Sequence, residues 1–466
     1  MVSDNTILLE FNALSRSLGA DMLSFGTGIR GFSSVSVDSR SVEEGALFVA
    51  LSGSASDGHA FVESAFRNGA AAALVEDQKI ESYNIRSIAK SMEKNIIIVK
   101  NTLCSLQDAA RVYLDQFPRL IKIGITGSSG KTTTKEITAA ISGAAKSTVM
   151  NPGNYNSETG MPLAAFNVRP CHEVGIFEIG MNRRGEIAEL ASVLKPHIAL
   201  ITNIGSAHIG LLGSKEAIAE EKKNIFSRMG ENDIALIPGD SDFRNFLAEG
   251  VRARVSFYGE SSFPELGGVR DLGLDGSEIT WAGRRAHFPL PGRHNLANAF
   301  AAIALARQIP VDVQAILQGL ESARPLFGRA EIYRGSVTVI QDCYNSNPES
   351  AAQALEFCES LNWPGRRIYV IGDMLELGDK SRQAHEEAGR LLRDSQADMV
   401  FLYGKEMEPA AGILETGSSR FMHTCDMDEL SHALGDYVRG GDMVLLKGSR
   451  GCALERLRAT LTGGAA

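Results

Sequence analysis

The sequence lacks several patterns that would assign it to a specialised class of protein. Its six cysteines lie far apart, with no C-x-x-C pair and no Cys/His cluster at zinc spacing. We therefore expect reduced, mostly buried thiols. No apolar run reaches about 18 residues, so no membrane span is predicted. The N-terminus carries Asp4 and Glu10 and has no long apolar core, so a signal peptide is not expected and the cytoplasm is favoured.

Positive charge is also scarce. There are 47 Lys and Arg residues against 56 Asp and Glu residues, which gives a net charge of −9. This balance argues against an extended surface for nucleic acid or anionic membrane, but it leaves room for a small basic pocket. The composition is otherwise that of an ordinary globular protein, and a length of 466 residues suggests roughly two to four domains.

The apolar runs divide the chain into three regions. Residues 1–117 hold short apolar runs broken by Gly and Ser, and Pro118 precedes the run LIKIGITG. Across residues 118–326, apolar runs alternate with helix-length segments, which predicts a parallel sheet with crossover helices. The same pattern returns over residues 327–466 and predicts a second doubly wound sheet. The sequence thus predicts an α/β protein with three domains.

The stretch GITGSSGKTTTKE, residues 124–136, has the features of a phosphate-binding loop. A buried strand precedes it and a helical pattern follows it, so its backbone N–H groups would face an anion. Gly127 and Gly130 allow close approach to phosphate, Lys131 can neutralise it, and Thr132 can ligate Mg²⁺. Ser128, Ser129 and Thr133 complete the predicted loop. The strict pattern requires glycine where Ile125 stands, one residue after Gly124, so a chance glycine-rich turn is the alternative.

Eight segments occur in the order seen in the Mur ligases, and the chain resembles that family over nearly its whole length. They are TGSSGKTTTKE, NPGNYNSETGMPL, FEIGMNRRGEI, TNIGSAHIGLLGS, GRHNLANAFAAIA, DCYNSNPES, GDMLELGD and LKGSRG. The resemblance implies an N-terminal UDP-sugar domain, a central ATPase domain with a mostly parallel sheet and a C-terminal Rossmann-like domain. It also implies ATP-driven amide formation in peptidoglycan synthesis, by a monomer.

Three further residues are candidate metal ligands beside Thr132. Glu178 ends the apolar run VGIFE, where a carboxylate is costly unless a cation or the ligand crevice receives it. A lone histidine such as His208 is more often a structural residue than a metal ligand. The resemblance implies that His208 is a metal ligand. Lys222 lies in EAIAEEKKNIF and reads as a charged helix face. The resemblance implies instead that CO₂ carbamylates Lys222, which turns an ammonium into an oxygen ligand for Mg²⁺.

The resemblance also assigns nucleotide and substrate contacts. Asn295 and Asn298 would contact ATP, with helix capping by Asn295 as a compatible alternative. Arg329 would stabilise the transferring phosphoryl group, and Asp342 would hold ribose or orient that arginine. The family usually has two adjacent acids here, whereas this chain has Gln341 before Asp342. The candidate substrate contacts are Ser39, Arg40, Asn154, Tyr155, Asn156, Thr159, Tyr344, Asn345, Asn347, Lys447, Ser449 and Arg450, with a plain turn as the alternative for the segment at 38–40.

Three functions remain open at this stage. The motifs CYNSNPES and GDMLELGD favour the addition of D-alanyl-D-alanine to UDP-N-acetylmuramoyl-tripeptide. A ligase that adds the third peptide residue would be expected to have a D-Y-A-H type sequence at 342–345, and a folylpolyglutamate synthase is the other related enzyme. A nucleotide-dependent scaffold without ligase activity is expected to lack the metal set, yet Thr132, Glu178, His208 and Lys222 are all present.

Overall fold

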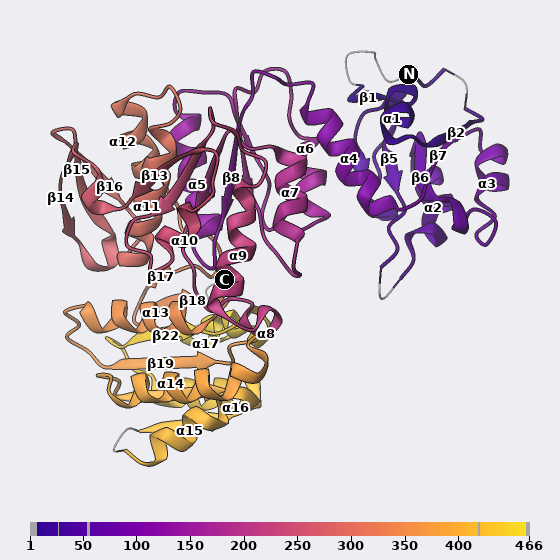
Figure 1. The fold of residues 1–466 in the computed structure, drawn as a ribbon. Helices are drawn as coiled ribbons and strands as arrows, with labels where there is room; N and C mark the ends of the chain where they lie inside the picture. Colours follow the sequence, from indigo (N-terminus) through magenta and orange to yellow (C-terminus); the bar gives the residue numbers. More distant parts are fainter. Residues whose placement is uncertain (1–6, 27, 54–55, 418–419, 463–466) are drawn as a thin grey trace.

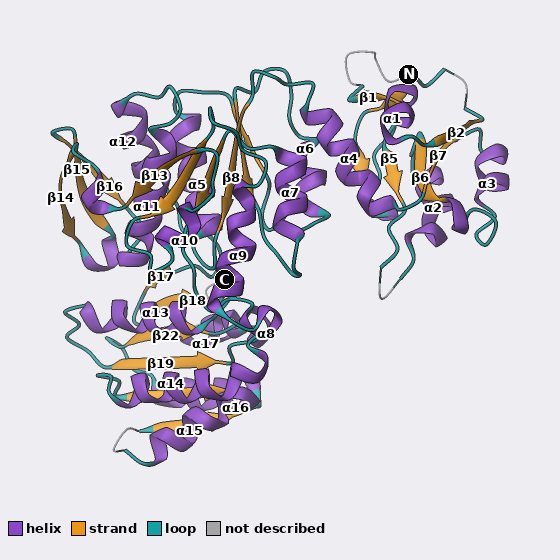
Figure 2. Ribbon diagram, viewed as in Figure 1, coloured by secondary structure: helices purple, strands orange, loops and turns teal. Residues whose placement is uncertain are grey.

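Three α/β units make up the computed structural model, which describes residues 7–26, 28–53, 56–417 and 420–462. Figure 1 shows the first unit in indigo beside the central unit, and the third unit in orange and yellow below it. Figure 2 shows a sheet with helices around it in each unit. The predicted fold class, three α/β domains with mostly parallel sheets, is confirmed.

The first unit is built on a five-stranded sheet in the order β2-β7-β6-β5-β4. β2 pairs antiparallel with β7, and the other pairs are parallel. The strands are β2 (Asp21–Ser24), β4 (Val35–Ser36), β5 (Leu47–Val49), β6 (Ala72–Glu76) and β7 (Asn95–Val99). A two-stranded sheet of β1 (Leu9–Glu10) and β3 (Gly31–Phe32) lies beside it, with helices α1 (Phe11–Leu18), α2 (Val62–Arg67) and α3 (Ile85–Ser91).

Helix α4 (Thr102–Leu114) joins the first unit to the central one. The Asn101 side chain caps it by accepting a hydrogen bond from the Cys104 N–H. Its buried face packs on α1 and on two helices of the central unit, α6 (Gly160–Ala165) and α7 (Glu186–Leu194). The Tyr113 hydroxyl donates to the Val168 carbonyl at 2.6 Å. Buried apolar side chains from both units form one continuous core here.

The central unit has a six-stranded sheet in the order β13-β12-β11-β8-β10-β9, with every pair parallel. The strands are β8 (Ile121–Thr126), β9 (Thr148–Met150), β10 (Val174–Glu178), β11 (Ile198–Ile201), β12 (Ile234–Pro238) and β13 (Arg254–Tyr258). Helices α5 (Lys131–Gly143), α11 (Arg293–Ala306) and α12 (Val313–Ser322) cover one face. Helices α7 and α9 (Lys215–Lys223) cover the other, so the strands are apolar on both sides.

A small antiparallel sheet, which the sequence analysis did not predict, is inserted between β13 and α11. Its strands are β14 (Leu266–Asp271), β15 (Ser277–Trp281) and β16 (Arg284–Phe288). Trp281 and Phe288 are fully buried in the core that α11 and α12 share with the main sheet. The short helices α8 (Ile209–Leu212) and α10 (Arg244–Ala248) also belong to the central unit.

The third unit has a six-stranded sheet in the order β17-β18-β22-β19-β20-β21, and only β17 runs antiparallel. The strands are β17 (Glu331–Arg334), β18 (Thr338–Asp342), β19 (Arg367–Gly372), β20 (Met399–Tyr403), β21 (Phe421–Thr424) and β22 (Met443–Lys447). One face carries α13 (Pro348–Ser360), α14 (Ser381–Arg393) and α15 (Glu408–Glu415); the other carries α16 (Met427–Tyr437) and α17 (Arg458–Leu461).

The cysteines are free but differ in burial from the expectation. Cys343, Cys358 and Cys452 are buried, whereas Cys104, Cys171 and Cys425 are exposed, so the prediction of mostly buried thiols holds for half of them. Among the described residues, no helix combines the length and the apolar character needed to cross a membrane.

Candidate active site

The predicted phosphate loop connects the end of β8 to the start of α5. β8 ends at Thr126 and α5 begins at Lys131, so residues 127–130 form the loop. Gly124 lies inside β8, where it faces Ile225 and Leu194 of the core. The glycine that seemed to be misplaced by one residue is therefore a strand residue, and the loop itself uses the shorter pattern.

The two loop glycines are required by backbone shape and by space. Gly127 has φ 153° and Gly130 has φ 76°, both in the region that favours glycine. A Cβ on Gly127 would lie 1.8 Å from the Thr202 Oγ1, and one on Gly130 would lie 2.1 Å from the Asn298 Oδ1. The loop is therefore held tightly between residues that follow β11 and residues on α11.

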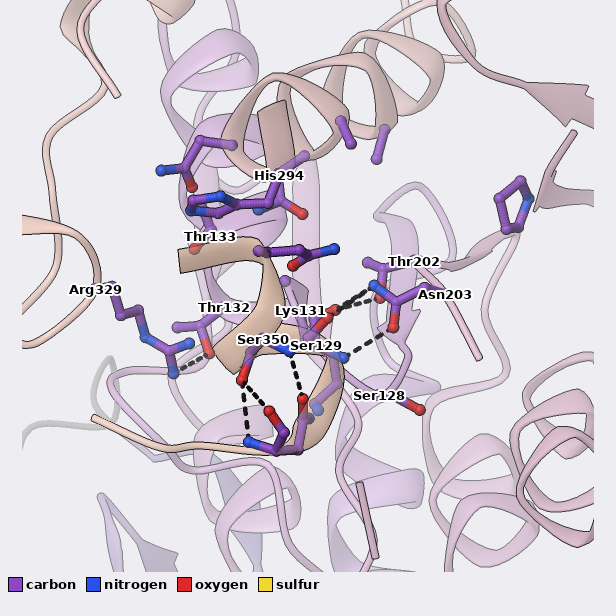
Figure 3. Close-up of a pocket in the computed structure, with 18 of the residues that line it drawn as sticks. Ser128, Ser129, Lys131, Thr132, Thr133, Thr202, Asn203, His294, Arg329 and Ser350 are labelled. Carbon is purple, nitrogen blue, oxygen red and sulfur yellow. Dashed lines mark hydrogen bonds between the residues drawn. The ribbon is translucent and has the colours of Figure 1, made fainter. Parts of the chain in front are cut away.

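Thr202 and Asn203, which follow β11, hold the loop in place. The Thr202 hydroxyl donates to the Ser129 carbonyl at 2.6 Å, and the Asn203 Oδ1 accepts from the Ser129 N–H at 3.0 Å. Figure 3 shows both side chains meeting the loop on the side opposite Arg329. Neither residue was predicted from the sequence, although both stand at a strand's carboxyl end, where such contacts are expected.

Two lysines converge on one carbonyl of the loop. The Lys131 and Lys222 Nζ atoms each donate to the Gly127 carbonyl at 2.9 Å. Lys222 is 1% exposed, and burial together with the charge of Lys131 holds its pKa well below the usual value. Lys223 instead donates to the Phe246 carbonyl, so the structure brings the predicted residue, Lys222, to the site.

Glu178 and His208 both line the cleft described below; Glu178 is the last residue of β10, and His208 directly precedes α8. The Glu178 Oε1 accepts from the Asn156 side chain at 2.6 Å. Its Oε2 is buried and has no hydrogen-bond partner among the described residues. His208 has φ 64°, and its Nδ1 lies 3.0 Å from the Glu376 Oε2 of the third unit. The hydrogen bond from His208 lowers the pKa of the Glu376 carboxyl.

The third unit contributes a cation and an acid to the same place. The Arg329 guanidinium lies 4.2 Å from the Tyr344 ring centroid and donates to the Thr132 hydroxyl at 3.0 Å (Figure 3). Asp342, at the end of β18, forms an ion pair with Lys447, at the end of β22, with 2.9 Å between Oδ2 and Nζ. Arg329 thus meets the phosphate loop across the boundary between the units.

These groups surround a cleft of about 1000 Å³ between the central and third units. The predicted residues that line it are Ser128, Ser129, Gly130, Lys131, Thr132, Thr133, Asn154, Asn156, Glu178, His208, Asn295, Asn298, Arg329, Asp342, Tyr344, Asn345, Asn347 and Lys447. Lys222 lies behind the Gly127 carbonyl rather than on the cleft wall.

Several predicted substrate residues lie apart from this cleft. Ser39 and Arg40 are in the first unit, where Arg40 pairs with Asp38 at 2.7 Å and its hydrogen bond lowers the pKa of Asp38 to about 2. Tyr155 and Thr159 follow the lining residue Asn154 but do not line the cleft themselves.

Ser449 and Arg450 also lie outside the cleft. The Ser449 hydroxyl accepts from the Leu375 N–H, and Arg450 packs on the Phe327 ring.

The structure corrects the expected helix cap at Asn295 and gives Gln341 a partner. Asn295 does not cap α11, because the N-cap residue is Gly292 and the Asn295 amide donates to the Pro291 carbonyl. Gln341, which stands where the family usually has an acid, is buried and donates to the Glu331 Oε2 at 2.9 Å. Gln341 therefore pairs with the neighbouring strand β17.

Three residues of the site were not predicted from the sequence, and one of them, Glu349, does not line the cleft itself. His294 lines the cleft, and burial lowers its pKa, which favours the neutral ring. Glu349, in the first turn of α13, accepts from the Ser206 N–H and hydroxyl and pairs with Lys215 at 2.9 Å. Glu376 reaches His208. These contacts cross the boundary between units, and neither partner's local sequence indicates them.

Comparison with known proteins agrees with this arrangement. Three family models match successive parts of the chain: the Mur ligase family catalytic domain at residues 32–113, the Mur ligase middle domain at 125–306 and the Mur ligase glutamate ligase domain at 328–450. The chain therefore belongs to the Mur ligase family of ATP-dependent ligases.

Similar proteins narrow the comparison. The UDP-N-acetylmuramoyl-tripeptide–D-alanyl-D-alanine ligase of Treponema pallidum is 43% identical over 98% of this chain and 99% of its own length. The enzyme of the same name from Bacillus subtilis is 33% identical over 91% and 92%. Among solved structures, MurF from Thermotoga maritima in complex with ADP has a TM-score of 0.77 and 30% identity, over 92% of this chain and 97% of that one.

Proposed function

We propose that this chain joins D-alanyl-D-alanine to UDP-N-acetylmuramoyl-tripeptide at the expense of ATP, which gives the UDP-N-acetylmuramoyl-pentapeptide with ADP and phosphate. The γ-phosphoryl group passes to the tripeptide carboxylate and forms an acyl phosphate. The dipeptide amine then attacks the acyl carbon, and phosphate leaves. The protein mainly positions the reactants, stabilises charge and excludes water from the acyl phosphate.

The observation that carries this proposal is the contact between Arg329 and the phosphate loop. The loop holds Lys131 and Thr132 on the central unit, and Arg329 reaches Thr132 from the third unit at 3.0 Å. A phosphoryl group seated on the loop would therefore have a cation on each side, as phosphoryl transfer requires. Asn295, Asn298 and Asp342 line the same cleft and are assigned to the nucleotide, with Gly127, Ser128, Ser129, Gly130 and Thr133.

We assign Thr132, Glu178, His208 and Lys222 to Mg²⁺. The donor set fits, because Glu178 has a buried oxygen without a hydrogen-bond partner among the described residues. A hydroxyl, a carboxylate and a second anionic oxygen suit Mg²⁺. When bound, Mg²⁺ would neutralise charge on the phosphates. In the structure, the Glu178 Oε1 accepts from the Asn156 side chain, and the His208 Nδ1 lies 3.0 Å from the Glu376 Oε2.

Lys222 is assigned as a carbamylated residue. Its amine is buried, and the low pKa favours the neutral form that can attack CO₂. The reaction forms an N–C bond and releases one proton, which leaves a carbamate. As an ammonium, Lys222 shares one carbonyl with Lys131 and repels it; as a carbamate, it would attract both Lys131 and Mg²⁺.

The remaining assignments concern the substrate and the whole chain. Asn154 and Asn156 line the cleft near Glu178, and Tyr344, Asn345, Asn347 and Lys447 line it from the third unit. We assign these residues, with Ser39, Arg40, Tyr155, Thr159, Ser449 and Arg450, to the UDP-muramyl-peptide and the dipeptide. We further propose domain limits at 1–117, 118–326 and 327–466, a monomer and a cytoplasmic location.

A phosphate-release assay tests this function. UDP-N-acetylmuramoyl-tripeptide and ATP are supplied with D-alanyl-D-alanine or with single amino acids. Parallel reactions contain ATP and the shorter UDP-muramyl-dipeptide with a diamino acid, or ATP and a folate with glutamate. We expect D-alanyl-D-alanine alone to stimulate release strongly. Stimulation by a diamino acid on the shorter UDP-muramyl-dipeptide would indicate the third-residue enzyme, and no stimulation by any amine would indicate a scaffold.

A further inference from the structure

His208 and Glu376 meet where the central and third units touch, and the reaction outlined above gives Glu376 no role. His208 precedes α8, and Glu376 lies between β19 and the 3₁₀ turn η8 (Gly378–Lys380). α8 and η8 are in contact, and Figure 1 shows α8 against the third unit. The His208 Nδ1 and the Glu376 Oε2 are 3.0 Å apart.

The backbone at this contact is unusual on both sides. His208 has φ 64° and Glu376 has φ 67°, a left-handed conformation that residues other than glycine adopt only at a cost. The Gly210 N–H donates to the Glu376 carbonyl at 3.2 Å, so one backbone hydrogen bond joins the two units beside the side-chain pair. Both residues are therefore held in position by the docking of the units.

Two glycines set how closely the units approach. A Cβ on Gly210 would lie 2.5 Å from the Gly378 backbone nitrogen, and one on Gly378 would lie 2.8 Å from the Gly210 Cα. No side chain fits at either position while the units are docked. The distance between His208 and Glu376 thus depends on a contact that only glycine at both positions allows.

The pair has a definite chemical consequence for the imidazole ring. A neutral histidine carries one N–H, and an Nδ1–H that donates to a carboxylate leaves the lone pair on Nε2. A ring nitrogen with a free lone pair is the form that binds a metal ion, and a carboxylate on the other nitrogen fixes the ring and raises its basicity.

We propose that Glu376 is a positioning residue that fixes the tautomer and orientation of His208, and that it does so only when the third unit is docked. This inference rests on the proposed role of His208 as a metal ligand. It means that one ligand of the central unit is brought into its binding form by the third unit, the unit that also supplies Arg329.

The first test is the tautomer of His208 by nitrogen NMR of protein labelled with ¹⁵N-histidine. The chain has nine histidines, and His208→Gln identifies the signal. We expect a protonated Nδ1 in the wild type and a shift toward the Nε2-protonated form in Glu376→Ala. Gly210→Ala keeps both side chains but blocks docking, so it should shift in the same way. Asp379→Asn, an exposed acid in η8, should leave the signal unchanged.

The second test is Mn²⁺ binding to the same variants with ADP present, followed by electron paramagnetic resonance. Glu376→Ala and Gly210→Ala should bind Mn²⁺ roughly tenfold more weakly. Glu376→Gln should remain within about threefold of the wild type, because its Oε1 still accepts from Nδ1–H.

A His208 protonated on Nε2 in the wild type would overturn the inference. So would wild-type Mn²⁺ affinity in Glu376→Ala when His208→Ala binds weakly, and this result leaves the proposed function intact. Unchanged affinity in both variants would overturn the metal role of His208 as well.

Discussion

The two large sheets each bury a lysine near the cleft, and the surroundings of these lysines differ. Lys447, at the end of β22, is 2% exposed and forms an ion pair with Asp342. Lys222, on α9 behind the central sheet, is buried to the same degree, but its hydrogen bond goes to the Gly127 carbonyl and Lys131 lies next to it. The two lysines are therefore equally buried, but Lys447 lies beside an acid and Lys222 lies beside another lysine.

The effect of burial on a lysine depends on which charged groups lie beside it. At Lys447, the carboxylate of Asp342 lies within ion-pair distance of the buried side chain. Without such a partner, a buried ammonium loses its proton more easily, as at Lys222. We therefore expect Lys447 to act as a cation and Lys222 to act as a carbamate.

The largest effect is expected at Lys131, which shares the Gly127 carbonyl with Lys222. Lys131→Ala should lower phosphate release by at least about a hundredfold, because the loop loses the cation that faces the transferring phosphoryl group. Steady-state assays with saturating substrates measure this loss, and thermal unfolding checks that the fold persists. Lys146→Ala, at a surface pair with Glu173, is the control. Near-normal turnover of Lys131→Ala would refute the phosphate-loop assignment.

Lys222→Ala should also lose most of its activity, with the loss in kcat, because metal and acyl-phosphate geometry matter most in the transition state. Added formate should restore part of the rate by returning carboxylate oxygens to the vacated space. Turnover with and without formate measures both effects. Lys223→Ala is the control and should change little. Full activity of Lys222→Ala would contradict the carbamate.

Lys447→Met should reduce kcat/KM by roughly tenfold, since Asp342 loses its partner and is left unpaired beside the cleft. Formate should not restore this variant, because it adds negative charge where a cation was removed. The measurement is the same formate titration used for Lys222→Ala. If formate rescues Lys447→Met as well, the contrast between the two lysines is wrong.

The smallest effect is expected at Glu349, which pairs with Lys215 between units. Burial would raise the pKa of this carboxyl, but hydrogen bonds from Lys215 and Ser206 outweigh it and hold the pKa below its usual value. Its stabilisation is therefore present above the ordinary carboxyl pKa and is lost as pH falls through the folded-state value. Allowing for solvent screening, Glu349→Gln should cost about 1 kcal/mol at neutral pH.

Thermal unfolding of Glu349→Gln and the wild type across pH 3 to 7 measures this difference. The two should differ by a few degrees at pH 7, and the difference should shrink as pH falls below the ordinary carboxyl pKa and through the lower folded-state pKa of Glu349. Glu356→Gln, an exposed acid on the same helix, is the control and should follow the wild type throughout. A difference that persists undiminished at pH 3 would contradict this account.

The sequence predicted the fold class because its signals are local. Buried strands such as Ile121–Thr126 and Arg367–Gly372 read as apolar runs, and the helices between them carry apolar faces. The antiparallel sheet β14–β16 escaped prediction because β14 and β16 are largely exposed and β14 contains two glycines. Its few buried side chains, such as Trp281 and Phe288, give too weak an alternation to register.

Without the family resemblance, the site could be predicted only where its residues are contiguous in the sequence. The phosphate loop was found because strand, glycines and lysine are contiguous. Thr202, Glu349 and Glu376 were missed because their partners are 73, 143 and 168 residues away in the chain, at Ser129, Ser206 and His208. Such contacts depend on how the units dock, and a local pattern holds no information on docking.

The two seams of the molecule differ in what opening them would expose. The first seam is the boundary between the first and central units along α4, where the two units share an apolar core. Separating these units would expose apolar side chains to water, which is unfavourable. The second is made largely of polar contacts, through Arg329, Glu349 and Glu376, whose partners water can replace. Ile209 and Leu274 of the central unit add apolar contacts with the third unit. Opening should therefore occur at the second seam, while the first unit, to which we assign the UDP end of the substrate, moves together with the phosphate loop.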